Sequence, residues 1–176
     1  MKSQSLYRVF FVVTAVFLIG LCSPILRAQT SGALTANSTA SVIQGINLVG
    51  QKDLRFGIII PDVLPGTVII NPVRARTKTG GPYLVNQGST TQWGPAQFVV
   101  SGEPNTAYSI TLPYNGIIII VGMEMMDVDE WTSYPSSNTS LSASGTQTFY
   151  VGGTLHVEGN QHWGSYSGAF TVTVHY

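Results

Sequence analysis

The residues from 168 to 176 alternate between apolar and polar side chains with a period of two. In an extended chain this period places the apolar residues on one face and the polar residues on the other. The apolar face comprises Phe170, Val172, Val174 and Tyr176, and the polar face comprises Thr171, Thr173 and His175. The stretch is therefore predicted to be a half-buried β-strand.

The same period recurs along much of the chain. Apolar residues hold even-numbered positions from Leu34 to Ile60, which predicts two or three extended segments facing one core, bent at Gly45 and Gly50. Residues 102–105 have the composition of a turn and predict a hairpin between the strands on either side. Further strands are predicted at residues 67–70, 97–100, 108–112, 117–121, 149–151 and 155–157.

Many short strands separated by turns predict an all-β fold, specifically an immunoglobulin-like antiparallel β-sandwich. We expect a single domain from Gln29 to Tyr176, because no linker divides the pattern. The residues expected in its core are Phe56, Phe98, Ile110, Leu112, Leu155, Phe170, Val172 and Val174.

Residues 1–28 have the pattern of a secretory signal peptide. Lys2 and Arg8 give the first eight residues a positive charge, and an apolar run extends from Val9 to Cys22. Ala28 is a small residue suited to cleavage. A membrane anchor is the alternative, but the run is shorter than the roughly 20 residues that a bilayer requires. We therefore expect cleavage after Ala28 and no membrane span in the mature protein. The expected location is the periplasm, the cell surface or the extracellular space.

Charge and cysteine content exclude two classes of function. The expected mature chain holds five Lys and Arg residues against eight Asp and Glu residues, a net charge of −3, which argues against nucleic-acid binding. The only cysteine, Cys22, lies in the expected signal peptide, so neither a disulfide nor thiol chemistry is expected.

Residues at catalytic spacing are not found in the sequence. The motif from Gly164 to Gly168 resembles a nucleophile elbow, but Tyr166 stands where the nucleophile would be. His156, His162 and His175 are not at zinc-ligand spacing, and His156 and His175 are expected to face solvent. We expect a protein that is not an enzyme and that uses no cofactor.

Two charged clusters each allow a binding role or a plain solvent-facing one. The acidic segment of residues 124–130 could supply oxygen ligands to calcium, or it could be a solvated strand end. Arg74, Arg76 and Lys78 alternate with uncharged residues, so they are expected on one strand face. There they could bind an anionic polysaccharide or a neighbouring subunit, or simply be the solvated side of the strand and discourage edge pairing.

Three tryptophans are candidates for ligand binding. Trp93, Trp131 and Trp163 could form a platform on which sugar rings stack. Packing in the core and in turns is the alternative for at least some of them. The first interpretation predicts a secreted carbohydrate- or matrix-binding module.

Three stretches carry a resemblance to a known family: DLRFGIIIP (53–61), GEPNTAYSITLP (102–113) and VGGTLHVEGNQHWGSYSGAFTVTVHY (151–176). They are similar to the bacterial domain-of-unknown-function family DUF4402, in which these motifs occur in this order. That family resembles the spore-coat-U and fimbrial subunits, which also end on a strand with a terminal tyrosine. The resemblance implies an exported immunoglobulin-like sandwich without established catalytic residues.

The stretch from Phe170 to Tyr176 contains no lysine or proline to protect a strand edge, so it must be covered by its own domain or by another subunit. Gly32 to Val42 is a candidate donor strand, because it has no charge and no proline. Gly45 could act as its hinge. One face of the donor would carry Leu34, Ala36, Ala40 and Val42.

These features predict a non-enzymatic cell-surface or fimbria-like structural or adhesive subunit that self-associates, or joins other surface subunits, by β-strand addition. The alternative for the segment is that it forms the first strand of its own sandwich.

Overall fold

The computed structural model describes residues 39–86, 92–136 and 138–176. Within them, Ser41 to Tyr176 form one unit, which is the domain described below. The expected signal peptide, its cleavage site and the predicted domain start at Gln29 lie outside the described residues.

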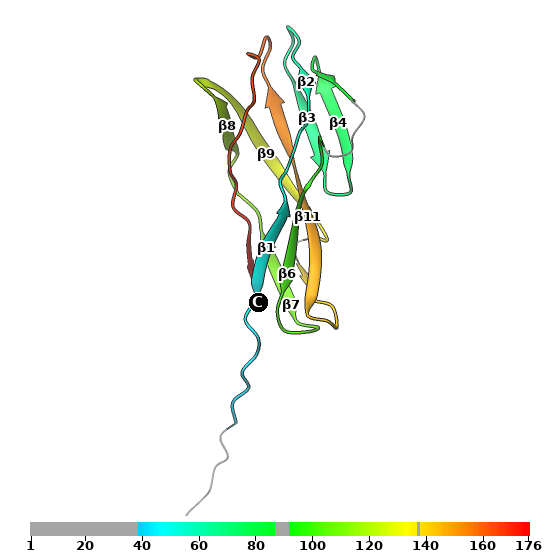
Figure 1. Ribbon diagram of the computed structural model, residues 1–176, viewed down its shortest axis with the longest axis vertical. Coiled ribbons are helices and arrows are strands. Elements are labelled where there is room, and N and C mark those ends of the chain that lie inside the picture. Colours follow the sequence, from blue (N-terminus) through cyan, green and yellow to red (C-terminus); the bar gives the residue numbers. More distant parts are fainter. Residues whose placement is uncertain (1–38, 87–91, 137) are drawn as a thin grey trace, which may run out of the picture. The chain divides into compact units, whose positions relative to one another are not determined.

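Twelve strands and no helix are found among the described residues (Figure 1). The period-two pattern of the sequence is therefore realised as extended chain. The strands are β1 (Asn47–Lys52), β2 (Ile59–Ile60), β3 (Gly66–Asn71), β4 (Ala75–Gly80), β5 (Tyr83–Leu84), β6 (Ala96–Ser101), β7 (Ala107–Thr111), β8 (Ile117–Val121), β9 (Glu124–Tyr134), β10 (Asn138–Ser140), β11 (Thr146–Val157) and β12 (Thr173–His175).

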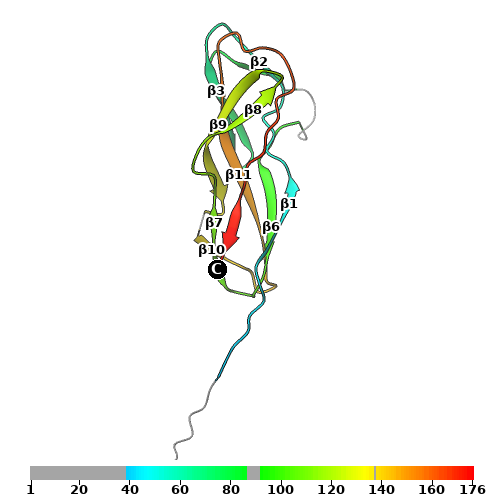
Figure 2. The same ribbon diagram turned by 90° about the vertical axis from the view of Figure 1, so that its left-hand side faces the viewer.

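The long strand β11 is the centre of the larger sheet. Its first half, Thr146–Val151, pairs with β6, and its second half, Gly153–Val157, pairs with β3. Strand β9 pairs with β11 over Tyr150–Leu155, while β1, β4 and β8 extend the sheet from β6, β3 and β9. A second sheet, with the order β10–β7–β12, lies near the C-terminus (Figure 2). Strand β2 pairs with β5. Every pairing is antiparallel, so the predicted all-β antiparallel β-sandwich is confirmed.

The core consists of two clusters of buried residues, and Trp131 packs against both. A row of aromatic rings extends through the first cluster. Phe149 stacks on Phe98 with 5.3 Å between ring centroids, Phe98 meets Phe170 edge-on at 6.3 Å, and Phe170 stacks on Trp131 at 4.6 Å. The buried apolar residues are Val68, Ile70, Ala96, Val100, Tyr108, Ile110, Val128, Leu141, Phe149, Val151, Leu155 and Val157.

Of the residues predicted to be in the core, Ile110 and Leu155 are buried. The other six are half-buried and pack against one of the two clusters: Phe56, Phe98, Leu112, Phe170, Val172 and Val174. The sequence pattern therefore identified inward-facing positions correctly, but it did not show which of them would be fully covered.

The predicted common phase from Leu34 to Ile60 is wrong at its end. Gly57 has a positive φ of 78°, which changes the direction of the chain after Phe56. As a result Ile59 is half-buried, and Ile58 and Ile60 are exposed. The bend predicted at Gly50 does coincide with a register shift in the pairing of β1 with β6.

The predicted hairpin at residues 102–105 is also wrong. Strand β6 belongs to the larger sheet, whereas β7 belongs to the three-stranded sheet. The turn therefore crosses from one layer of the sandwich to the other. Its glycine, proline and asparagine provide tight chain reversal in either topology, so composition alone could not distinguish the two.

Phe149 provides a test of the packing. We expect Phe149→Ala to lower the free energy of unfolding by about 3–5 kcal/mol, because its fully buried ring would leave a cavity next to Phe98. Tyr114→Ala is the matched control, since the Tyr114 side chain is fully exposed and should change stability by less than about 0.5 kcal/mol. Urea unfolding of the mature protein measures both, and equal effects would contradict this description of the core.

Candidate functional site

Strand β12 has one paired edge and one open edge among the described strands. It pairs with β7 through Thr173 with Thr111, Val174 with Ile110 and His175 with Ser109. Strand β1, in the other sheet, pairs only with β6. Strands β1 and β12 lie near each other but share no backbone hydrogen bonds, so a strip between the two sheets is not closed by strand pairing.

Apolar side chains line this strip, which we call the seam. They all pack against the first core cluster, but they remain half-buried although they point inward. In the same cluster, Val100 and Val151 are completely buried. The seam residues are Ile46, Leu48 and Leu54 on the β1 side and Phe170, Val172 and Val174 on the β12 side.

One end of the seam is held by hydrogen bonds around Tyr176. The Tyr176 hydroxyl accepts a hydrogen bond from the Glu103 backbone N–H at 2.6 Å and donates one to the Gln44 carbonyl at 3.0 Å. The Gln44 N–H donates in turn to Glu103 Oε2 at 3.0 Å. We call these three residues the clasp. It joins the segment before β1, the turn between β6 and β7, and the residue after β12.

Gly102 makes room for the clasp. A Cβ atom at this position would collide with the Tyr176 hydroxyl. The clasp was not predicted from the sequence, because Tyr176 was assigned to the apolar face of its strand. Its phenol is the one signal that could have indicated the clasp, since a tyrosine hydroxyl can both donate and accept a hydrogen bond.

The candidate donor segment is only partly described. Leu34 and Ala36 lie outside the described residues. Ala40 and Val42 are exposed and belong to no strand, and the Val42 side chain is 96% exposed. The first strand of the domain begins at Asn47 instead. Ala40 and Val42 are thus not used by the sheets to which β1 and β12 belong.

The three candidate tryptophans have different surroundings. Trp131 packs against both core clusters and stacks on Phe170. Trp93 is half-buried, next to Gly57. Trp163 is 82% exposed, and one face of its ring stacks on His162 with 5.2 Å between centroids. Of the three, only Trp163 presents a largely open ring.

The three cations predicted to form a row do not share one strand face, and two of them have partners within the fold. Arg74 lies in the turn between β3 and β4 with a φ of 65°. The Arg76 side chain donates to the carbonyls of Ile58 at 2.8 Å and Val85 at 3.3 Å, and burial lowers the pKa of Arg76. Lys78 donates to the Gly80 carbonyl and lies over the Tyr83 ring at 5.2 Å. Arg76 therefore binds the backbone next to β2 and β5, and Lys78 binds the end of its own strand and the Tyr83 ring.

Two carboxylates of the acidic segment, those of Asp129 and Glu130, contact different partners. Asp129 Oδ1 lies 2.7 Å from His156 Nε2, and Glu130 Oε2 accepts a hydrogen bond from the Thr154 hydroxyl at 2.8 Å. In the described part of the chain, no three His, Cys, Asp or Glu side chains are arranged to hold a metal ion. The partner of His156 was missed by the sequence pattern, because Asp129 and His156 are 27 residues apart.

The glycine-flanked motif around Tyr166 also has a structural role. Its hydroxyl donates to the His162 carbonyl at 2.9 Å and accepts from Gln161 Nε2 at 2.9 Å. Gln161 is buried and also donates to the Met125 carbonyl. This network fixes the chain beside the β8–β9 hairpin, and it uses Tyr166 as a hydrogen-bonding anchor.

Comparison with known proteins gives one result. The family model DUF4402, a domain of unknown function, matches residues 46–176. The chain belongs to this family. The DUF4402 region begins at the seam residue Ile46 and contains all twelve described strands. Neither the curated proteins nor the solved structures contain a match. The described part of the chain also has no helix long and apolar enough to cross a membrane.

Gly102→Ala tests the clasp. We expect it to lower the free energy of unfolding by about 1–2 kcal/mol, because the added methyl displaces the Tyr176 hydroxyl and breaks its hydrogen bonds. Gly45→Ala is the control, since no atom lies within 4 Å of a Cβ at that position. Urea unfolding compares the two variants, and an equal response would show that the clasp adds no stability.

Proposed function

We propose that this DUF4402 protein is an exported, non-enzymatic cell-surface or fimbria-like structural or adhesive subunit that assembles by β-strand addition. In this assembly, Gly32 to Val42 of one copy adds to the open edge of β12 in the next copy. The observation that carries the proposal is the seam, where an open strand edge and half-buried inward-facing apolar residues coincide.

Strand addition would supply the two things that the seam lacks, which are hydrogen-bond partners for β12 and cover for its apolar side chains. Backbone N–H and C=O groups along β12 would gain hydrogen-bond partners, and alternate donor side chains would cover the seam residues. The donor has the required period of two, with Leu34, Ala36, Ala40 and Val42 on its apolar face. Thr35, Asn37, Thr39 and Ser41 would then face solvent.

Two other outer strands are protected in ways that β12 is not. Strand β4 carries Arg76 and Lys78, and charged side chains discourage edge pairing. Ile120 in β8 exchanges both of its backbone hydrogen bonds with Ser167, so a passing segment covers that edge. Strand β12 has neither protection along Thr173–His175. This contrast favours β12 as the acceptor.

The non-enzymatic part of the proposal is supported by how the polar side chains are used. The side chains of His156, Asp129, Arg76 and Tyr166 all make hydrogen bonds that hold parts of the fold together. Export is supported by the basic and apolar pattern of residues 1–28.

Cysteine cross-linking tests strand addition directly, because the expected mature chain contains no cysteine. We mix a Thr173→Cys protein with proteins that carry a single cysteine at Thr35, Asn37, Thr39 or Ser41, and oxidise mildly. We expect a disulfide-linked heterodimer for at least one donor position, because residues opposite each other in paired strands have Cβ atoms about 4.5–5.5 Å apart.

The matched control is Thr77→Cys, an exposed threonine on the outer strand β4. It should give no heterodimer with any of the four donors. Cross-linking that occurs only within one chain carrying both cysteines would show that the segment is a strand of its own domain. No cross-link at any of the four positions would reject strand addition altogether.

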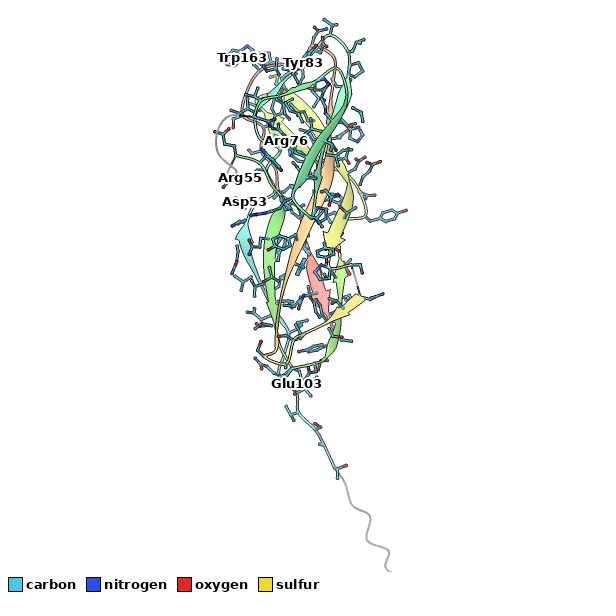
Figure 3. All side chains as sticks on the ribbon, turned by 90° about the vertical axis from the view of Figure 1, so that its right-hand side faces the viewer. Asp53, Arg55, Arg76, Tyr83, Glu103 and Trp163 are labelled. Atoms are coloured by element: carbon cyan, nitrogen blue, oxygen red, sulfur yellow. The ribbon has the colours of Figure 1, made fainter. Side chains whose placement is uncertain are left out.

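Trp163 favours a second candidate function, which is carbohydrate or matrix binding. Its ring is 82% exposed, and stacking on His162 covers only one of its faces. The free face could stack on the apolar side of a sugar ring. Figure 3 shows Trp163 at the opposite end of the sandwich from Glu103 of the clasp, so the two candidate sites are separate.

A glycan array with the mature protein tests this second function. We expect reproducible binding that Trp163→Ala reduces by at least about tenfold, since loss of one stacked aromatic ring costs about 1–3 kcal/mol when it anchors a ligand. Tyr114→Ala, which removes another exposed aromatic side chain, should leave binding unchanged. No binding, or equal loss in both variants, would rule out a site at Trp163.

A further inference from the structure

The clasp uses both backbone groups of Gln44. Its N–H donates to Glu103, and its carbonyl accepts from Tyr176. Gln44 lies two residues after Val42, where the candidate donor segment ends, and three residues before β1 begins. The clasp therefore holds the connection between the donor segment and its own domain.

This position determines what the donor segment can reach. To fill the seam of its own domain, the segment would have to reverse direction between Val42 and Asn47 and run back beside β1. Hairpin turns of this kind need two to about five residues with a specific backbone conformation. Gln44 lies in the middle of that turn, and its backbone groups are bound to Tyr176 and Glu103 instead.

Such a restraint is needed if copies are to assemble. A strand connected to its own domain by a short linker has an effective concentration on the order of millimolar. At micromolar protein concentration, self-insertion would therefore exceed donation to another copy unless the geometry prevents it. A donor segment without a restraint would give closed monomers.

We propose that Tyr176 is a positioning residue for strand donation, which it directs to a second copy of the chain by holding Gln44 so that residues 32–42 cannot fold back onto their own seam. This inference rests on the proposed function. Tyr176 acts through Gln44 and Glu103 and need not touch the incoming strand. Because its hydroxyl also lies one residue beyond β12, the same contact holds the end of the acceptor strand.

Tyr176→Phe tests the inference in the full mature protein. It is combined with Thr173→Cys and the donor cysteine that cross-links most efficiently in the mixing experiment. With Tyr176 present, oxidation should give mainly chains linked to one another. With Tyr176→Phe, the ratio of internal to intermolecular disulfide should rise at least about tenfold, because self-insertion regains its advantage of effective concentration.

Three further variants separate the positioning role from a general loss of stability. Ile70→Val removes a methylene group from a fully buried side chain in β3, outside the clasp, so it lowers stability and should leave the disulfide ratio unchanged. Glu103→Gln keeps an acceptor oxygen for Gln44 and should retain intermolecular linkage, whereas Glu103→Ala should shift the ratio in the same direction as Tyr176→Phe. If Tyr176→Phe does not fold, the two Glu103 variants decide the question.

The possible results distinguish the two levels of the proposal. Equal disulfide ratios in folded Tyr176 and Tyr176→Phe proteins would overturn the role of the clasp and leave strand addition standing. Absence of intermolecular linkage with Tyr176 present would overturn strand addition, and the positioning role with it. A loss of intermolecular linkage in Ile70→Val as large as that in Tyr176→Phe would show that only stability is being measured.

Discussion

The backbone groups along an outer β-strand must find hydrogen-bond partners, and among the described strands β12 has such partners on one edge only. It has three residues, pairs only with β7 among the described strands, and lies beside β1 without pairing with it. The inward-facing Val172 and Val174 next to this edge are only half-buried. Along the seam, backbone hydrogen bonding and the burial of apolar side chains are thus both incomplete. One additional strand beside β12 would complete both.

The rest of the structure holds this edge in place. Strand β11 joins β6, β3 and β9 in one sheet, and the row of rings from Phe149 to Trp131 connects that sheet to Phe170 just before β12. At the other end of β12 the clasp connects Tyr176 to the turn between the two sheets. The seam is therefore fixed at both ends, and its open middle is a feature of a well-supported scaffold.

The period-two pattern was enough to predict the fold class, because alternation directly reports which side of a strand is covered. It failed where one residue changed the phase, as at Gly57, and where a turn joined different sheets, as at residues 102–105. It also placed Arg76 on a solvated face, whereas in the structure Arg76 binds two carbonyls. Long-range partners such as Gln44 and Tyr176, 132 residues apart, leave no periodic signal in the sequence.

The central claim is that β12 accepts a strand from another copy. Amide hydrogen–deuterium exchange of the mature protein, followed over residues 170–176 and 32–42 as protein concentration increases, measures this most directly. The account predicts that residues 32–42 and the β12 amides that are not bonded to β7 exchange rapidly at low concentration and become protected together as copies associate, because each then pairs with the other. Protection of both segments that does not depend on concentration would show that the domain closes its own edge, and would contradict the account.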